Sequence, residues 1–247
     1  MMMFQWLLHR YHKNHKKACY PSPVVALPFL FLVTGLTSSC SKNPLDAVFK
    51  RPISAPQPSC GFLQNAYGER ISWKTNLPVR MYIHESVPRQ FVPVIYSSMK
   101  HWEGLSKQPL FQIVSESYRD SGQARQDGFN VIYWVTSDWP NTNGKGSHSS
   151  HHPKMEQART TVHTVGNQIV EADLRINAQR FDFYVDQPKS PLSIHFESLM
   201  IHELGHVLGL AHNEHSPNDI MWTHLLPLTE RTQFSEENRM AIQCEYN

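Results

Sequence analysis

Residues 202–212 read HELGHVLGLAH, the most specific pattern in the chain. His202 and His206 are four residues apart, so on a helix both imidazoles project from one face, about one turn apart. That spacing lets them share a metal ion at about 2.0 to 2.1 Å. Gly209 can adopt the backbone conformation that ends a helix and turns the chain. The turn would bring His212 back as a third ligand.

Glu203 follows the first of these histidines and places a carboxylate beside the metal. Three imidazole ligands leave the fourth position of a zinc ion to water, and a carboxylate there can accept the proton of that water. The chain contains 15 histidines, yet the five specified residues at this spacing arise by chance on the order of once in 10,000 such sequences. The segment therefore predicts a site for one catalytic Zn²⁺, and it says nothing about calcium.

The pattern resembles the zinc-binding motif of the metzincin metalloproteases, and it is most similar to their matrixin branch in its bacterial form. Met221, nine residues after His212 in the segment NDIMW, stands where the family carries a methionine in a tight turn. The resemblance implies that Met221 forms an apolar floor beneath the histidines. It covers about residues 68–247 and implies an α+β, metzincin-like (zincin) fold. That fold has a twisted, mostly parallel sheet with an antiparallel edge strand, an active-site helix and a C-terminal helix.

The activity that this resemblance implies is endopeptidase hydrolysis of a protein or peptide substrate by a metal-activated water, with Glu203 as the base. Two alternatives remain open. The first is a non-catalytic, zinc-stabilised surface binding module, against which Glu203 argues because zinc held for stability needs ligands and no base. The second is a zinc amidase that acts on small or cell-wall substrates.

The sequence also departs from the family pattern. Asn213 follows the third histidine where matrixins usually have serine, and Trp222 and Thr223 follow the methionine where several families carry a tyrosine, so no tyrosine is assigned a role at the metal. The segment Val170–Arg175 lacks the histidine that binds a second, structural zinc in vertebrate matrixins, so we do not expect that zinc. Four further histidines are interpreted as solvated side chains: His148, His151, His152 and His163.

The composition indicates a folded, exported protein. Of 247 residues, 40% are apolar and 18% are charged, which suits a packed core. Residues 1–39 hold four basic residues and no acid, and they contain the apolar run 24–36, which matches a secretory signal peptide and is too short to span a bilayer. Residues 40–247 hold 19 basic and 21 acidic groups, which disfavours a nucleic-acid partner. We expect a signal peptide (1–39), a tether (40–60) and a monomeric catalytic domain (61–247).

The cysteines also indicate an exported protein. Cys40 ends the segment LTSSC, which resembles a bacterial lipobox, so we expect it to carry lipid and to anchor the protein in the cell envelope; simple secretion is the alternative. Cys60 and Cys244 then remain as an even pair and predict a disulfide between the two ends of the domain. A competing interpretation is that Pro58–Gly61 resembles the inhibitory cysteine-switch motif of matrix metalloproteinase propeptides.

Periodicity predicts the elements around the motif. Alternation and apolar runs indicate strands, and apolar residues at helical spacing followed by a stop signal indicate helices. Strands are expected within 70–83, 109–114 and 128–136, followed by a hairpin of 159–164 and 168–176. Helices are expected at 90–104, 192–208 and 236–245, the last with Ser235 as N-cap.

Overall fold

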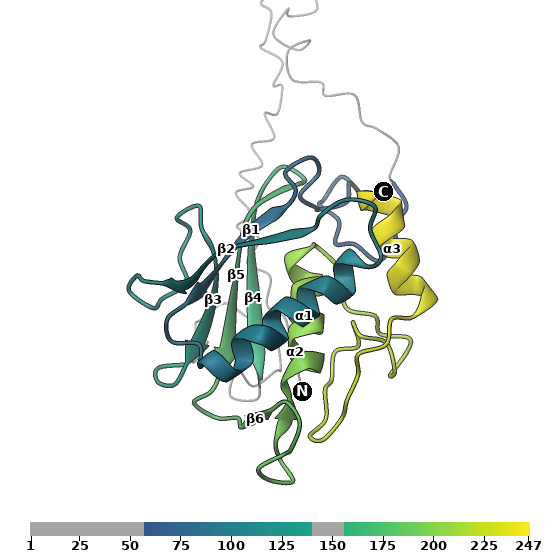
Figure 1. The fold of residues 1–247 in the computed structure, drawn as a ribbon. Helices are drawn as coiled ribbons and strands as arrows, with labels where there is room; N and C mark the ends of the chain where they lie inside the picture. Colours follow the sequence, from purple (N-terminus) through teal and green to yellow (C-terminus); the bar gives the residue numbers. More distant parts are fainter. Residues whose placement is uncertain (1–56, 140–155) are drawn as a thin grey trace, which may run out of the picture. The chain divides into compact units, whose positions relative to one another are not determined.

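The computed structural model describes residues 57–139 and 156–247 (Figure 1). The predictions of a signal peptide and of lipid on Cys40, most of the tether, and three of the loop histidines (His148, His151 and His152) lie outside these residues. Within the described part of the chain, no helix combines the length and the apolar character needed to cross a membrane.

The centre of the fold is a five-stranded sheet in the order β2-β1-β3-β5-β4. Its first four strands in that order are parallel to one another, and β4 pairs antiparallel with β5 at the edge. The strands are β1 (Val79–His84), β2 (Phe111–Tyr118), β3 (Asn130–Val135), β4 (Ala158–Val165) and β5 (Gln168–Asn177). The expected α+β class, mostly parallel sheet and antiparallel edge strand are confirmed.

Three helices accompany the sheet: α1 (Val92–Glu103), α2 (Phe196–Val207) and α3 (Glu236–Tyr246). In Figure 1, α1 and α2 lie side by side next to the sheet, and α3 lies on the side of these helices away from it. The indole Nε1 of Trp102 in α1 donates a hydrogen bond of 2.8 Å to the carbonyl oxygen of Ile201 in α2. This buried bond holds the two helices in a defined register.

Helix α2 is buried along almost its whole length, and Glu197 alone among its residues is not fully buried. A helix that is apolar on nearly every side packs inside a protein rather than on its surface. Its buried polar side chains include the candidate metal-site residues, because His202, Glu203 and His206 are at most 3% exposed. The sequence therefore places three costly polar side chains in the interior, where each needs a partner.

Several predicted boundaries were wrong. The helix expected from Leu192 begins at Phe196, because Ile194–His195 (β7) instead pairs with Phe183–Tyr184 (β6) in a second, two-stranded sheet. In the stretch 70–83, the strand occupies only the alternating end at Val79–His84. The helix expected from residue 90 begins with a 3₁₀ turn at Arg89–Phe91, consistent with the proline that follows it near the start of α1.

Candidate metal centre

The three predicted histidine ligands come together in the structure. One ring nitrogen from each of His202, His206 and His212 lies within 4.8 Å of the others. The Nε2 atoms of His202 and His206 are 3.0 Å apart. Two nitrogens bound to one tetrahedral zinc ion would lie about 3.3 Å apart, given the usual zinc–nitrogen distance. The spacing of the imidazoles therefore fits one small cation.

The hydrogen bonds of two of these rings show why a cation suits the site. Nδ1 of His202 contacts the carbonyl oxygen of Ile220 at 2.6 Å, and Nδ1 of His206 contacts that of Leu210 at 2.8 Å. Because a carbonyl oxygen only accepts, each Nδ1 carries the hydrogen and each neutral ring has a bare lone pair at Nε2. Two lone pairs facing each other cannot form a hydrogen bond, whereas a metal ion between them would satisfy both.

Burial keeps these imidazoles neutral. Loss of water lowers the pKa of His202 to about 3 and that of His212 to about 4, and it lowers the pKa of His206 well below its usual value. The neighbouring histidines lower these values further for His202 and His206. A neutral imidazole is the form that binds metal, so the site is ready to accept a cation at neutral pH.

Gly209 makes the turn that returns His212. Its φ is +101°, and a Cβ there would lie 2.4 Å from the carbonyl oxygen of Ile71. The amide of Leu63 donates to the carbonyl of Gly209 at 3.0 Å, and the amide of Ala211 donates to that of Gly61 at 2.8 Å. The N-terminal segment of the domain thus pairs with the turn and fixes the path of the chain to His212.

Met221 packs closely against the metal-binding helix α2. A Cβ on Gly205 would lie 2.5 Å from the Sδ of Met221 and 2.9 Å from the ring of Trp102, so glycine lets the turn approach α2 closely. The amide of Asn213 also donates to the carbonyl of Met221 at 2.8 Å. A glycine inside a helix costs stability, and here its small size gives space to the methionine.

Asp219, which the sequence analysis did not single out, anchors this turn. Its Oδ1 accepts from the amide of Met221 at 2.7 Å and from the side chain of Asn238 at 3.1 Å, and its Oδ2 accepts from the hydroxyl of Ser235 at 2.6 Å. Ser235 and Asn238 form the capping box of α3. One buried carboxylate therefore joins the methionine turn to the start of the last helix.

Glu203 follows His202 on α2 and is 1% exposed. Its Oε2 accepts a hydrogen bond of 2.7 Å from the hydroxyl of Thr160, which stands on the edge strand β4. Burial raises the pKa of Glu203 to about 7, and the hydrogen bond from Thr160 opposes part of that rise. A carboxyl that titrates near neutral pH is suited to accept and return protons. Sequence patterns gave no signal for Thr160, because it lies 43 residues before its partner.

The predicted disulfide pair and two further histidines stand outside the three-histidine group. Cys60 and Cys244 form a disulfide with a Cα–Cα distance of 6.4 Å, which joins α3 to the start of the domain. His163 lies on β4, where its Nε2 is 3.8 Å from Glu171 of β5. His101 contacts Glu197 at 3.6 Å. These two histidines stand beside carboxylates and outside the three-histidine group.

The segment after Met221 lines up beside the edge strand. The side chain of Gln157, next to β4, donates a hydrogen bond of 2.9 Å to the carbonyl oxygen of Leu225. Leu225 is buried, and the residues after it, Leu226–Leu228, are exposed. The chain therefore leaves the methionine turn, passes the beginning of β4, and presents apolar side chains to solvent there.

Comparisons with known proteins agree with this geometry. The model of the matrixin family matches residues 94–247, which include most of α1, all of α2 and α3, the edge strand, the three histidines and the methionine turn. No curated protein matches the chain.

Proposed function

Because the chain belongs to the matrixin family of zinc metallopeptidases, we propose that it is an endopeptidase in which His202, His206 and His212 bind the catalytic zinc and Glu203 is the general base. The observation that carries the proposal is the position of Glu203, which is buried, follows His202 on α2 and accepts a hydrogen bond from Thr160. A site kept for stability alone would need the imidazoles and not this carboxylate.

When bound, zinc lowers the pKa of a water to about 7 and polarises the carbonyl of the scissile bond. Glu203 accepts the proton of the attacking water and delivers it to the nitrogen of the leaving amine. Thr160 holds the carboxylate in place through its hydroxyl. The two backbone carbonyls that accept from Nδ1 of His202 and His206 keep the Nε2 lone pairs directed toward the metal.

The edge strand β4 supplies the surface for the substrate. It ends the sheet order, so among the described residues one of its sides has no partner strand. An extended peptide can add to such an edge through main-chain hydrogen bonds, which bind without strong sequence preference. Thr160 lies on this strand and contacts Glu203, so a paired peptide would pass beside the base. The exposed residues Leu226–Leu228 would form part of the wall that receives a substrate side chain.

The test combines zinc analysis with protein cleavage on the same preparations of the full chain. We expect about one zinc per chain, cleavage of denatured casein, and loss of cleavage with a chelator that zinc restores. His206→Ala should lose both metal and activity, since it removes a ligand. Bound zinc without cleavage of any protein would favour the binding module, and cleavage of short amides alone would favour the amidase.

We also propose that the protein is exported and anchored by lipid on Cys40, with residues 41–60 as a tether. The proposal rests on the basic and apolar run before Cys40 and on an oxidised pair, Cys60 and Cys244, which suits an oxidising compartment. Intact mass and detergent partitioning of the native product test it. An unmodified N-terminus downstream of Cys40 on a protein in the medium would overturn it.

A further inference from the structure

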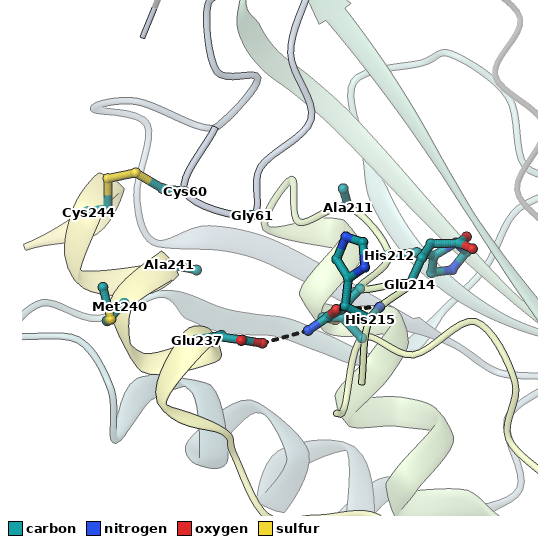
Figure 2. Close-up of a pocket in the computed structure, with 12 residues that line it drawn as sticks. Cys60, Gly61, Ala211, His212, Glu214, His215, Glu237, Met240, Ala241 and Cys244 are labelled. Carbon is teal, nitrogen blue, oxygen red and sulfur yellow. Dashed lines mark hydrogen bonds between the residues drawn. A yellow bond between two sulfur atoms is a disulfide. The ribbon is translucent and has the colours of Figure 1, made fainter. Parts of the chain in front are cut away.

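A pocket of about 500 Å³ opens next to the metal centre, and none of the roles above uses it. The loop after α2 forms one of its sides and α3 forms the other (Figure 2). His212 and Met221 both line it, so the pocket borders the metal centre and shares two residues with it. A peptide bound at the metal would therefore have this hollow within reach of its side chains.

The inner surface of the pocket is largely apolar. Ala241 and Met221 are buried, whereas the side chain of Met240 is 59% exposed on the α3 side. The disulfide of Cys60 and Cys244 closes one end (Figure 2). An exposed methionine offers a flexible, polarisable contact that adapts to long side chains. This lining suits an aliphatic chain.

The rim of the pocket is acidic. Glu214 and Glu237 both line it and are exposed, and no lysine or arginine lines it. Oε2 of Glu237 accepts a hydrogen bond of 2.8 Å from the side chain of Asn213, which directs this carboxylate across the pocket from α3 to the facing loop (Figure 2). Asn213 is the residue at which the chain departs from the usual matrixin serine. The charge therefore favours a cation at the mouth of an apolar pocket.

The position of the pocket along β4 determines which half of a substrate reaches it. β4 begins beside Leu225, as the bond from Gln157 shows. β4 ends at the hairpin whose other strand starts with Gln168 and Ile169, and Ile169 packs against the turn at Gly209. Antiparallel pairing is more stable than parallel pairing, so we expect a bound peptide to run antiparallel to β4. Such a peptide starts beside the end of β4 and finishes beside its beginning. Its residues before the scissile bond then lie toward Gly209, His212 and the pocket.

We propose that this pocket receives the side chain of a lysine or arginine that precedes the scissile bond in the substrate. The aliphatic stem lies along the apolar inner surface, and the charged end reaches Glu237 on the α3 side of the rim. Long basic side chains bury their stems in this manner while the charge stays in water. The inference rests on the proposed peptidase activity, and it adds a preference that the metal centre alone does not create.

The test is a set of fluorogenic peptides in which each of the three positions before the cleaved bond carries lysine, arginine, norleucine or glutamate in turn. At one position, kcat/KM should follow the order basic, then norleucine, then glutamate. Glu237→Gln keeps the acceptor for Asn213 and removes the charge, so it should lower the lysine-to-norleucine ratio about 2- to 5-fold, as expected for an exposed ion pair. Raised ionic strength should reduce the ratio in the unaltered protein.

Glu236→Gln is the matched control, because Glu236 also lies in the first turn of α3 but does not line the pocket. It removes the same charge from the helix end and should leave the ratio unchanged. Equal ratios in the Glu237 variant and the unaltered protein would overturn the inference, as would a glutamate preference at all three positions. Absence of cleavage by the unaltered, zinc-loaded protein would instead contradict the proposed function.

Discussion

Glu203 and Asp173 are both buried carboxyl groups whose pKa is raised to about 7 by loss of water, yet their surroundings differ. Glu203 lies on α2 between two of the three clustered histidines in sequence and accepts from the hydroxyl of Thr160. Asp173 lies on β5 and accepts from the backbone amide of Val131 on β3, which joins two strands. For both carboxyl groups, the raised pKa reports burial and does not by itself identify a function. The neighbouring ligand set is what distinguishes a base from a structural acid.

The largest expected difference between the two carboxyls is in catalysis. Glu203→Ala should lower casein cleavage by about 10,000-fold while zinc content stays near one per chain, because the residue serves both the attack of water and the departure of the amine. Asp173→Asn should leave kcat/KM within a few-fold of the unaltered protein. Near-normal cleavage by Glu203→Ala would remove the base from the mechanism, and loss of zinc in that variant would make Glu203 a ligand or a fold determinant.

Removal of the disulfide tests whether the metal centre and the sheet around Asp173 are stabilised together. Cys60 and Cys244 close a loop with a sequence separation of 184 residues. Replacing both with serine should lower the free energy of unfolding by about 2 to 5 kcal/mol, measured by urea denaturation. Hydrogen exchange should show lost protection mainly in α3, while β3 and β5 around Asp173 keep theirs. Equal loss in all three elements would mean that both regions open as one unit.

Alanine substitutions at two glycines with positive φ compare how well the metal centre and the region of Asp173 tolerate a Cβ. Gly209→Ala at the metal centre should cost about 2 kcal/mol or more, because its Cβ would meet the carbonyl of Ile71 in addition to the strain of φ +101°. Gly128, whose amide donates to Glu171 beside Asp173, has a φ of +86° and open space around a Cβ. Gly128→Ala should therefore cost less, about 1 kcal/mol. Urea denaturation of both variants measures the difference, and a larger loss at Gly128 would contradict it.

The last expected difference is the pH dependence that Asp173 gives to stability. Its pKa is about 7 in the fold and 3.8 ordinarily, so between these values the folded state holds the proton more tightly. The contribution is fully present below about pH 4 and is lost as the pH rises toward 7. Asp173→Asn keeps an acceptor for Val131 and removes the titration.

This variant should be stabilised by several kcal/mol at pH 8 and by less at pH 5, measured as free energies of unfolding, because each unit of pKa shift is worth about 1.4 kcal/mol. Asp186→Asn, which changes an exposed carboxylate, is the control and should show no such difference between the two pH values. A stability gain for Asp173→Asn that is equal at pH 5 and pH 8 would show that the buried acid does not titrate in this range.

Much of the site could be predicted from the sequence because its spacing is local. A spacing of four residues places His202 and His206 on one helix face in any α-helix, and Gly209 is the residue type that a turn at positive φ requires. The antiparallel hairpin around Gly166 and the cap of α3 at Ser235 follow from equally short-range patterns. These elements were predicted to within a few residues.

The tertiary structure decided the rest, because it depends on contacts between segments far apart in the chain. Thr160 reaches Glu203 from the edge strand, and Asp219 joins the methionine turn to α3; no local period encodes either contact. Ile194–His195 became a strand instead of the first turn of α2 because Phe183–Tyr184 was available to pair with it. The acidic pocket likewise exists only where α3 packs opposite the loop that carries His212. Backbone geometry sets local periodicity from sequence alone, whereas packing selects which distant side chains share the interior.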